Sequence, residues 1–84
     1  MRVTLKLYAS LMAHLPPQAT DRHAVDLDLP EGATVLEALQ RQGVPPSQCA
    51  IALVDGVWIG AQDRATQVLK PGQTLAVWPP VAGG

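Results

Sequence analysis

The chain has 84 residues, 48% of them apolar, and a net charge of −1 at pH 7, which indicates one small globular domain. It has no run of Lys or Arg that could neutralise phosphates, so nucleic acid is not expected as a partner. A single Cys excludes an intramolecular disulfide and a multi-cysteine zinc site, and no apolar stretch is long enough to span a membrane, so we expect a cytoplasmic domain.

The N-terminal third is predicted to form a strand, a short helix and a second strand. Residues 2–8 alternate between apolar and polar side chains, which predicts a half-buried strand with its aliphatic face toward the core. In this alternation Tyr8 lies on the opposite face. Residues 9–15 are predicted to form a short helix that ends at Pro16, and residues 23–29 alternate again and predict a strand.

The main helix is predicted over residues 34–42. Thr34 stands at the N-cap position, and Glu37 follows three residues later as its capping-box partner. Gly43 stands where a left-handed residue commonly ends a helix. The apolar stripe of this helix is expected to pack on a sheet.

A hairpin is predicted after this helix. Residues 50–54 form a short apolar run, which predicts a strand buried on both faces. Asp55-Gly56 is a strong signal for a two-residue hairpin turn, and residues 57–59 form the return strand.

An irregular polar connection is predicted over residues 60–67, where Asp63 and Arg64 are interpreted as loop charges that contribute little to stability. Residues 69–73 predict a tight turn at the start of the last strand.

The last strand leads into an unusual C-terminal segment. Its alternation places Trp78 on the face away from the aliphatic core, as for Tyr8. Pro79-Pro80 fixes φ and disfavours helix, so the chain is expected to leave the domain stiff and extended. Gly83-Gly84 has no Cβ atoms, so it fits a narrow channel and leaves a terminal carboxylate unhindered.

These elements predict an α+β domain over residues 1–78, followed by a flexible tail over residues 79–84 that ends in Gly-Gly. The whole chain resembles the ubiquitin-like β-grasp sulfur carriers, most closely the molybdopterin synthase small subunit, with the thiamine-pathway carriers as cousins. The resemblance is carried by the opening strand into Tyr8-Ala9-Ser10-Leu11, the helix after Glu31-Gly32, the turn Leu69-Lys70-Pro71-Gly72 and the end Trp78-Pro79-Pro80-Val81-Ala82-Gly83-Gly84.

The resemblance implies a β-grasp fold, with a mixed sheet of about five strands and one main helix packed across it. Two positions depart from the family pattern: Trp78 stands where an aromatic such as Phe is usual, and Gln73 stands where an acidic residue is common. Neither departure touches the Gly-Gly end.

The resemblance also implies a mechanism in which the chain is a cosubstrate and not an enzyme on its own. An E1-like adenylating enzyme uses ATP to activate Gly84, and a sulfur donor protein then converts the terminus to a thiocarboxylate. The catalytic large subunit of molybdopterin synthase uses this sulfur in molybdenum cofactor synthesis. Gly83 and Gly84 are thus the reacting end, and no cofactor is expected to stay bound.

Aromatic side chains on an open sheet face are candidates for binding these partners, because Tyr and Trp are enriched at interface hot spots. Alternatively, one or more of them closes the rim of the core. The candidate partner-binding residues are Tyr8, Trp58, Trp78, Pro79, Pro80, Val81 and Ala82.

Other functions stay open at this point. The sulfur could go to thiazole, cysteine or a modified nucleoside. The resemblance favours molybdopterin, because thiazole carriers usually lack a pair such as Pro79-Pro80. The chain could also be a ubiquitin-like modifier joined through Gly84 to lysines, or an interaction module with an inert tail.

Several polar residues are interpreted without a chemical role. Asp26 and Asp28 could offer carboxylates to a metal, but without a third ligand nearby a solvated strand face is the better interpretation, so no metal site is expected. His14 and His23 are interpreted as isolated surface or helix-end residues, and Cys49 as an inert thiol.

Overall fold

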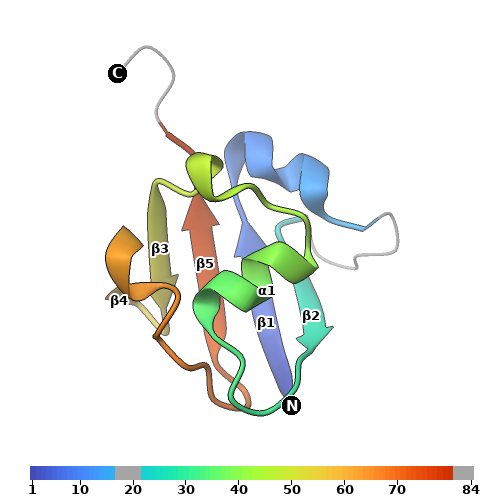
Figure 1. Cartoon of the computed structure of the whole chain (residues 1–84). Coiled ribbons are helices and arrows are strands. Elements are labelled where there is room, and N and C mark those ends of the chain that lie inside the picture. The colour runs from blue at the N-terminus through green and yellow to red at the C-terminus, as the bar shows by residue number, and fades with distance from the viewer. Residues whose placement is uncertain (17–21, 81–84) are drawn as a thin grey trace.

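The computed structural model describes residues 1–16 and 22–80, and Figure 1 shows one sheet with the main helix lying across one of its faces. Short 3-10 helices are labelled η. The elements are β1 (Arg2–Leu7), η1 (Ala9–His14), β2 (Ala24–Asp28), α1 (Val35–Arg41), η2 (Pro46–Gln48), β3 (Ile51–Val54), β4 (Val57–Trp58), η3 (Ala61–Asp63) and β5 (Thr74–Trp78). The predicted α+β class, with a five-stranded sheet and one main helix, is confirmed.

The sheet has the strand order β2-β1-β5-β3-β4, so the first and last strands lie together near its centre. β1 and β5 are parallel, and the other neighbouring pairs are antiparallel, which makes the sheet mixed. Because β1 and β5 run in the same direction, both end at the same edge of the sheet. At this edge the chain leaves β5 beside η1 and η2 (Figure 1).

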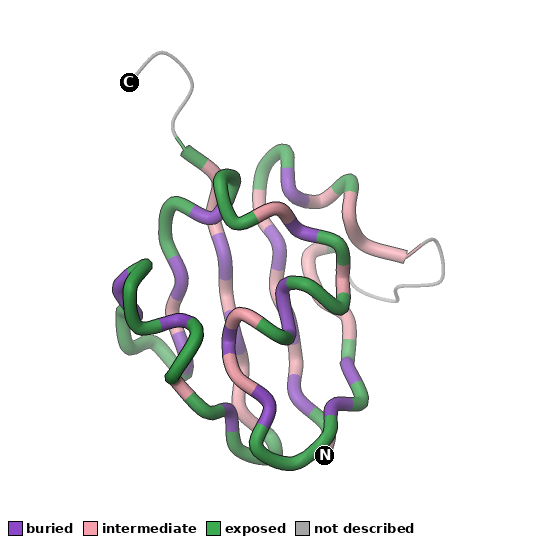
Figure 2. The backbone as a smooth tube through the Cα atoms, in the orientation of Figure 1, coloured by how far each residue is buried: buried purple, intermediate pink, exposed green. Residues whose placement is uncertain are grey.

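The core lies between the sheet and α1. Along β1, β3 and β5 the inward residues are buried, and Figure 2 shows the resulting alternation of purple and pink along the central strands. α1 turns Val35, Ala38 and Leu39 toward these residues. η1 adds Leu11, which is fully buried. With no Phe in the chain, aliphatic side chains fill this interior.

Both ends of α1 have the predicted signals. The Thr34 hydroxyl accepts a hydrogen bond from the Glu37 N–H at 3.2 Å, which confirms the N-cap. Gly43 has φ of 76° in the left-handed region, and the Val44 N–H donates to the Leu39 carbonyl at 2.9 Å. This is the hydrogen-bond pattern of a Schellman ending, so the predicted C-terminal stop is also confirmed.

The two predicted turns are present. Asp55 and Gly56 have φ of 48° and 83°, and two positive values are typical of the type I′ turn that suits a two-residue hairpin. Gly72 has φ of 82°, and the Gln73 N–H donates to the Lys70 carbonyl at 3.2 Å. These turns fix where β4 and β5 begin.

The short helix expected over residues 9–15 is present as the 3-10 helix Ala9–His14. Two local predictions need correction. The connection over residues 60–67, expected to be irregular, contains η3. The prediction that residues 50–54 are buried on both faces is wrong, because α1 covers one face of the sheet. As a result Ile51 keeps 43% of its surface exposed, and Leu53 is half-buried.

The N-cap makes a testable contribution to stability. We expect Thr34→Ala to lower the free energy of unfolding by about 1 kcal/mol, because the Glu37 N–H at the start of α1 loses its acceptor. Chemical denaturation measures this loss. The exposed Ser10→Ala serves as a hydroxyl control and should change stability by less than about 0.5 kcal/mol. Equal stability of Thr34→Ala and wild type would contradict the assigned cap.

Candidate functional site

The sheet face opposite α1 carries the predicted aromatic residues, and we call it the open face. Residue pairing brings them together: Leu7 pairs with Val77, so Tyr8 follows beside Trp78, and Trp78 pairs with Ile51 across β5 and β3. The open-face residues on which the site depends are Tyr8, Trp78, Ile51, Leu53 and Trp58. The prediction that Tyr8 and Trp78 share the face away from the aliphatic core is confirmed.

Tyr8 and Trp78 form a ring stack at the edge where the chain leaves β5. Their ring centroids are 4.5 Å apart and their planes differ by 4°. His23 stacks on Tyr8 at 4.8 Å and 25°, and its Nδ1 lies 3.3 Å from the Leu7 carbonyl oxygen. The interpretation of His23 as an isolated residue is therefore wrong, because the antiparallel pairing of β1 and β2 brings it next to Tyr8.

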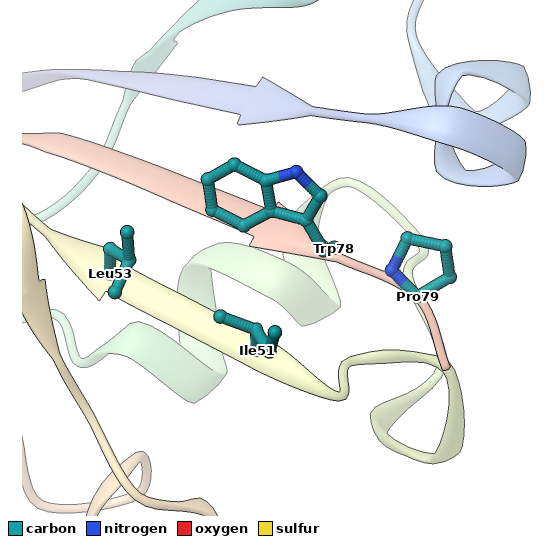
Figure 3. Close-up of a pocket in the computed structure, with 4 residues that line it drawn as sticks. All are labelled: Ile51, Leu53, Trp78 and Pro79. Atoms are coloured by element: carbon teal, nitrogen blue, oxygen red, sulfur yellow. The ribbon is translucent and has the colours of Figure 1, made fainter. Parts of the chain in front are cut away.

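A shallow apolar hollow of about 350 Å³ lies next to this stack. Figure 3 shows its lining on the side of the sheet away from α1: Ile51 and Leu53 project from β3, Trp78 from β5, and Pro79 follows directly. Pro79 is half-buried and Pro80 is exposed. The predicted partner-binding residues Trp78 and Pro79 thus form part of one apolar surface at the chain exit.

Trp58 extends this surface toward the edge of the sheet. It pairs with Leu53 across the β3–β4 hairpin and keeps 62% of its surface exposed. A Cβ atom placed on Gly60 would lie 3.2 Å from the Trp58 ring, so the ring lies against the backbone of Gly60, where the glycine permits the close approach. Trp58 therefore joins the open face as an exposed residue and is not part of the core.

The other end of the open face is polar. The Thr4 hydroxyl donates to Asp26 Oδ1 at 2.9 Å, and Asp26 and Asp28 are exposed. Lys6 is half-buried on β1, between Thr4 and Tyr8. The apolar part of the open face consequently lies over β3, β4 and the end of β5, next to the point where the chain leaves the sheet.

Cys49 is buried just before the start of β3, at the end of the sheet where the chain leaves β5. Burial raises the pKa of its thiol, and the nearby positive charge of Arg64 opposes that shift in part. Its Sγ lies 3.5 Å from the Pro45 carbonyl oxygen. A buried thiol with a raised pKa reacts slowly, which supports its interpretation as inert.

Arg64 does not behave as the sequence suggested. It is 6% exposed and donates hydrogen bonds to the carbonyl oxygens of Cys49 and Ala50. The interpretation of Arg64 as a loop charge of little weight is therefore wrong. The polar residues around Arg64 in the sequence gave no sign of these hydrogen bonds, because Cys49 and Ala50 lie 15 and 14 positions away along the chain.

The reacting end proposed from the sequence, Gly83 and Gly84, and the adjoining Val81 and Ala82 lie outside the described residues. Their roles stay predictions, as does the binding of partners by the open face. Within residues 1–16 and 22–80, no three or more His, Cys, Asp or Glu side chains gather into a possible metal site. No helix in these ranges is long and apolar enough to cross a membrane.

Comparison with known proteins now adds a family and a fold. A model of the ThiS family matches residues 11–84. No curated protein sequence gives a significant match.

Two solved structures are similar over the whole domain. SAMP1 from Haloferax volcanii has 21% sequence identity and a TM-score of 0.66, with 100% of both chains covered. A putative molybdopterin converting factor, subunit 1, from Pyrococcus furiosus has 20% identity and a TM-score of 0.64, covering 95% of this chain and 98% of that chain. At these identities the matches establish the fold, and the predicted ubiquitin-like β-grasp is confirmed.

The ring stack gives a prediction for a double-mutant cycle. We expect Tyr8→Leu and Trp78→Leu to show a coupling energy of about 0.5–1.5 kcal/mol in chemical denaturation, because each substitution removes the same stacked contact. The pair Tyr8→Leu and Trp58→Leu is the control and should be additive within about 0.5 kcal/mol. Additivity in both cycles would show that the stack does not hold the end of β5.

Proposed function

Since the chain belongs to the ThiS family, we propose that it is a sulfur carrier, a cosubstrate that carries sulfur on its C-terminal carbonyl carbon and has no catalytic activity alone. The observation that carries the proposal is the exit of the chain from the centre of a β-grasp sheet. β5 ends at Trp78, and Pro79-Pro80 follows beside an apolar hollow. In the sequence, only residues 80–82 separate Gly83-Gly84 from Pro79, which belongs to a surface suited to a protein partner.

The proposed chemistry begins with the carboxylate of Gly84, which is a poor electrophile. An E1-like adenylating enzyme transfers AMP from ATP to this carboxylate and releases pyrophosphate. A sulfur donor protein then delivers sulfur at the oxidation level of sulfide to the carbonyl carbon. A C–S bond forms, the C–O bond to AMP breaks, and AMP leaves. The resulting thiocarboxylate is ionised and nucleophilic at neutral pH, as a thiolate is. Gly83 and Gly84 carry this reaction because glycine without Cβ fits a narrow active-site channel.

The open face is proposed to bind the enzymes that act on this end. Its apolar part contains two Trp and one Tyr, the residue types enriched at interface hot spots, and it adjoins Pro79. A partner that covers the hollow would also receive Pro80, Val81 and Ala82, and with them the reacting end. One surface could in this way serve the activating enzyme and the sulfur acceptor in turn.

The proposed acceptor is the catalytic large subunit of molybdopterin synthase, which places the chain in molybdenum cofactor synthesis. Pro79-Pro80 supports this destination over thiazole synthesis, and a similar structure carries the name of a molybdopterin converting factor subunit. The ATP and reduced sulfur that the reaction consumes suit a cytoplasmic location.

A deletion strain tests the destination. Cells that lack this chain are expected to lose the activity of their molybdenum-cofactor-dependent enzymes, and the full chain should restore it. A chain without Gly84 should restore none of this activity, because it lacks the carboxylate that receives sulfur. Assay of a molybdenum-dependent reductase in cell extracts provides the measurement.

Growth without added thiamine is the matched control in the same strain. Normal molybdenum enzymes combined with a thiamine requirement would contradict the proposed destination and favour thiazole. Full rescue by the chain without Gly84 would contradict the carrier chemistry altogether.

A further inference from the structure

We infer that Arg64 is a positioning residue that fixes the direction in which the chain leaves the sheet between Trp78 and Pro79. The inference rests on the proposed function, since a fixed exit matters when the C-terminal end must enter a partner. Arg64 is 6% exposed and is the one buried charged residue among residues 1–16 and 22–80. A buried charge is costly unless it is well hydrogen-bonded, so its position needs a reason.

The guanidinium holds two successive carbonyl groups at the start of β3. Its Nη1 donates to the Cys49 carbonyl at 2.5 Å, and its Nη2 donates to the Ala50 carbonyl at 3.3 Å. Its Nε is buried and has no hydrogen-bond partner among the described residues. Two donors in a planar fork suit two neighbouring acceptors, which the single ammonium group of Lys would not hold in the same way.

The peptide unit between Cys49 and Ala50 links this contact to the chain exit. Its carbonyl accepts from Arg64, and its N–H donates to the Trp78 carbonyl at 3.0 Å. A charged donor on the carbonyl polarises the peptide unit and strengthens the hydrogen bond made by its N–H. Arg64 therefore orients and strengthens a hydrogen bond from the residue before β3 to the last residue of β5, next to the ladder pairing of Ile51 with Trp78.

This bond lies at the end of the β3–β5 ladder, where Ile51 also pairs with Trp78 and the chain leaves the sheet. Pro79 and Pro80 have no N–H and cannot donate a further ladder bond. On the other side of β5, the Tyr8 N–H donates to the Val77 carbonyl at 3.2 Å, and the Tyr8 ring stacks on Trp78. The exit is thus held on both sides, and on the β3 side Arg64 supports the hydrogen bond from Ala50 in addition to the pairing of Ile51 with Trp78.

The backbone of Arg64 is fixed as well. Its carbonyl accepts the N–H of Leu36 at 3.0 Å in the first turn of α1. The side chain therefore extends from an anchored position at the start of the main helix to the start of β3. Loss of the guanidinium should weaken the hydrogen bond from the Ala50 N–H to the Trp78 carbonyl and widen the range of directions that the chain can take after Trp78, while the apolar residues of the open face stay in place.

Amide hydrogen exchange measured by NMR tests the tether without any sulfur chemistry. In Arg64→Lys and Arg64→Met we expect the Ala50 amide to exchange at least about tenfold faster, a change of about 1.4 kcal/mol. The Asp55 amide, which donates to the Thr74 carbonyl at 2.9 Å at the other end of the same ladder, should keep its rate. Arg41→Met is the control, because exposed Arg41 also donates to a carbonyl, that of Asp28 at 3.3 Å.

Equal acceleration of the Ala50 and Asp55 amides would show general destabilisation and overturn the inference, as would no change at Ala50. If Arg64→Met does not fold, the milder Arg64→Lys decides the result by the same ratio of rates.

The reaction with the activating enzyme then tests positioning. With Arg64→Lys the rate of thiocarboxylate formation at saturating carrier should fall several-fold at unchanged KM, because docking by the open face is preserved. Wild-type rates in Arg64→Lys would overturn the positioning role and leave the proposed function intact. If the wild type itself gains no sulfur, the proposed function and the positioning role are both overturned, and the exchange ratio still decides whether Arg64 tethers the exit.

Discussion

The parallel pairing of β1 with β5 is the contact on which the remaining structure depends, because it brings the two ends of the domain together at the centre of the sheet. Leu5 beside Leu75 and Leu7 beside Val77 build the inward face that α1 covers. The same register places Tyr8 next to Trp78 on the outward face and stacks their rings. The contact that stabilises the core therefore also determines where the chain leaves the sheet.

Because α1 covers only one face of the sheet, the side chains on the other face are available for binding. The seven-residue helix α1 packs on one side of the sheet and leaves Ile51, Leu53 and Trp58 partly or largely exposed on the other. Exposed apolar groups of this kind, gathered at one edge, are typical of protein interaction sites. The polar Thr4–Asp26 pair on β1 and β2 limits the apolar area to the part of the face that holds β3, β4 and Pro79. This arrangement supports the proposal that the sheet domain binds the partner protein and the C-terminal end of the chain reacts.

Sequence reasoning succeeded where the signal was local. Alternation located β1, β2 and β5 and the faces of Tyr8 and Trp78, and short motifs located the Thr34 cap and the Asp55-Gly56 turn. It failed where contacts join distant segments: it missed the burial of Arg64 against Cys49 and Ala50, the stacking of His23 on Tyr8, and the exposed side of β3. The hollow could have been anticipated, since Ile51 and Leu53 are in phase with Trp78 once a single covering helix is assumed. Gly83 and Gly84 lie outside the described residues, so their role still rests on the sequence.

The most direct test of a carrier that reacts at its C-terminal end is the intact mass of the protein after incubation with ATP, a sulfur source and an extract of its own cells. The account predicts a mass gain equal to the exchange of one oxygen for sulfur, located at Gly84 by fragmentation and dependent on ATP. The absence of this gain, in an extract that is active on a known carrier, would contradict the account. Adducts of higher mass that resist thiol reductants would instead identify a protein modifier.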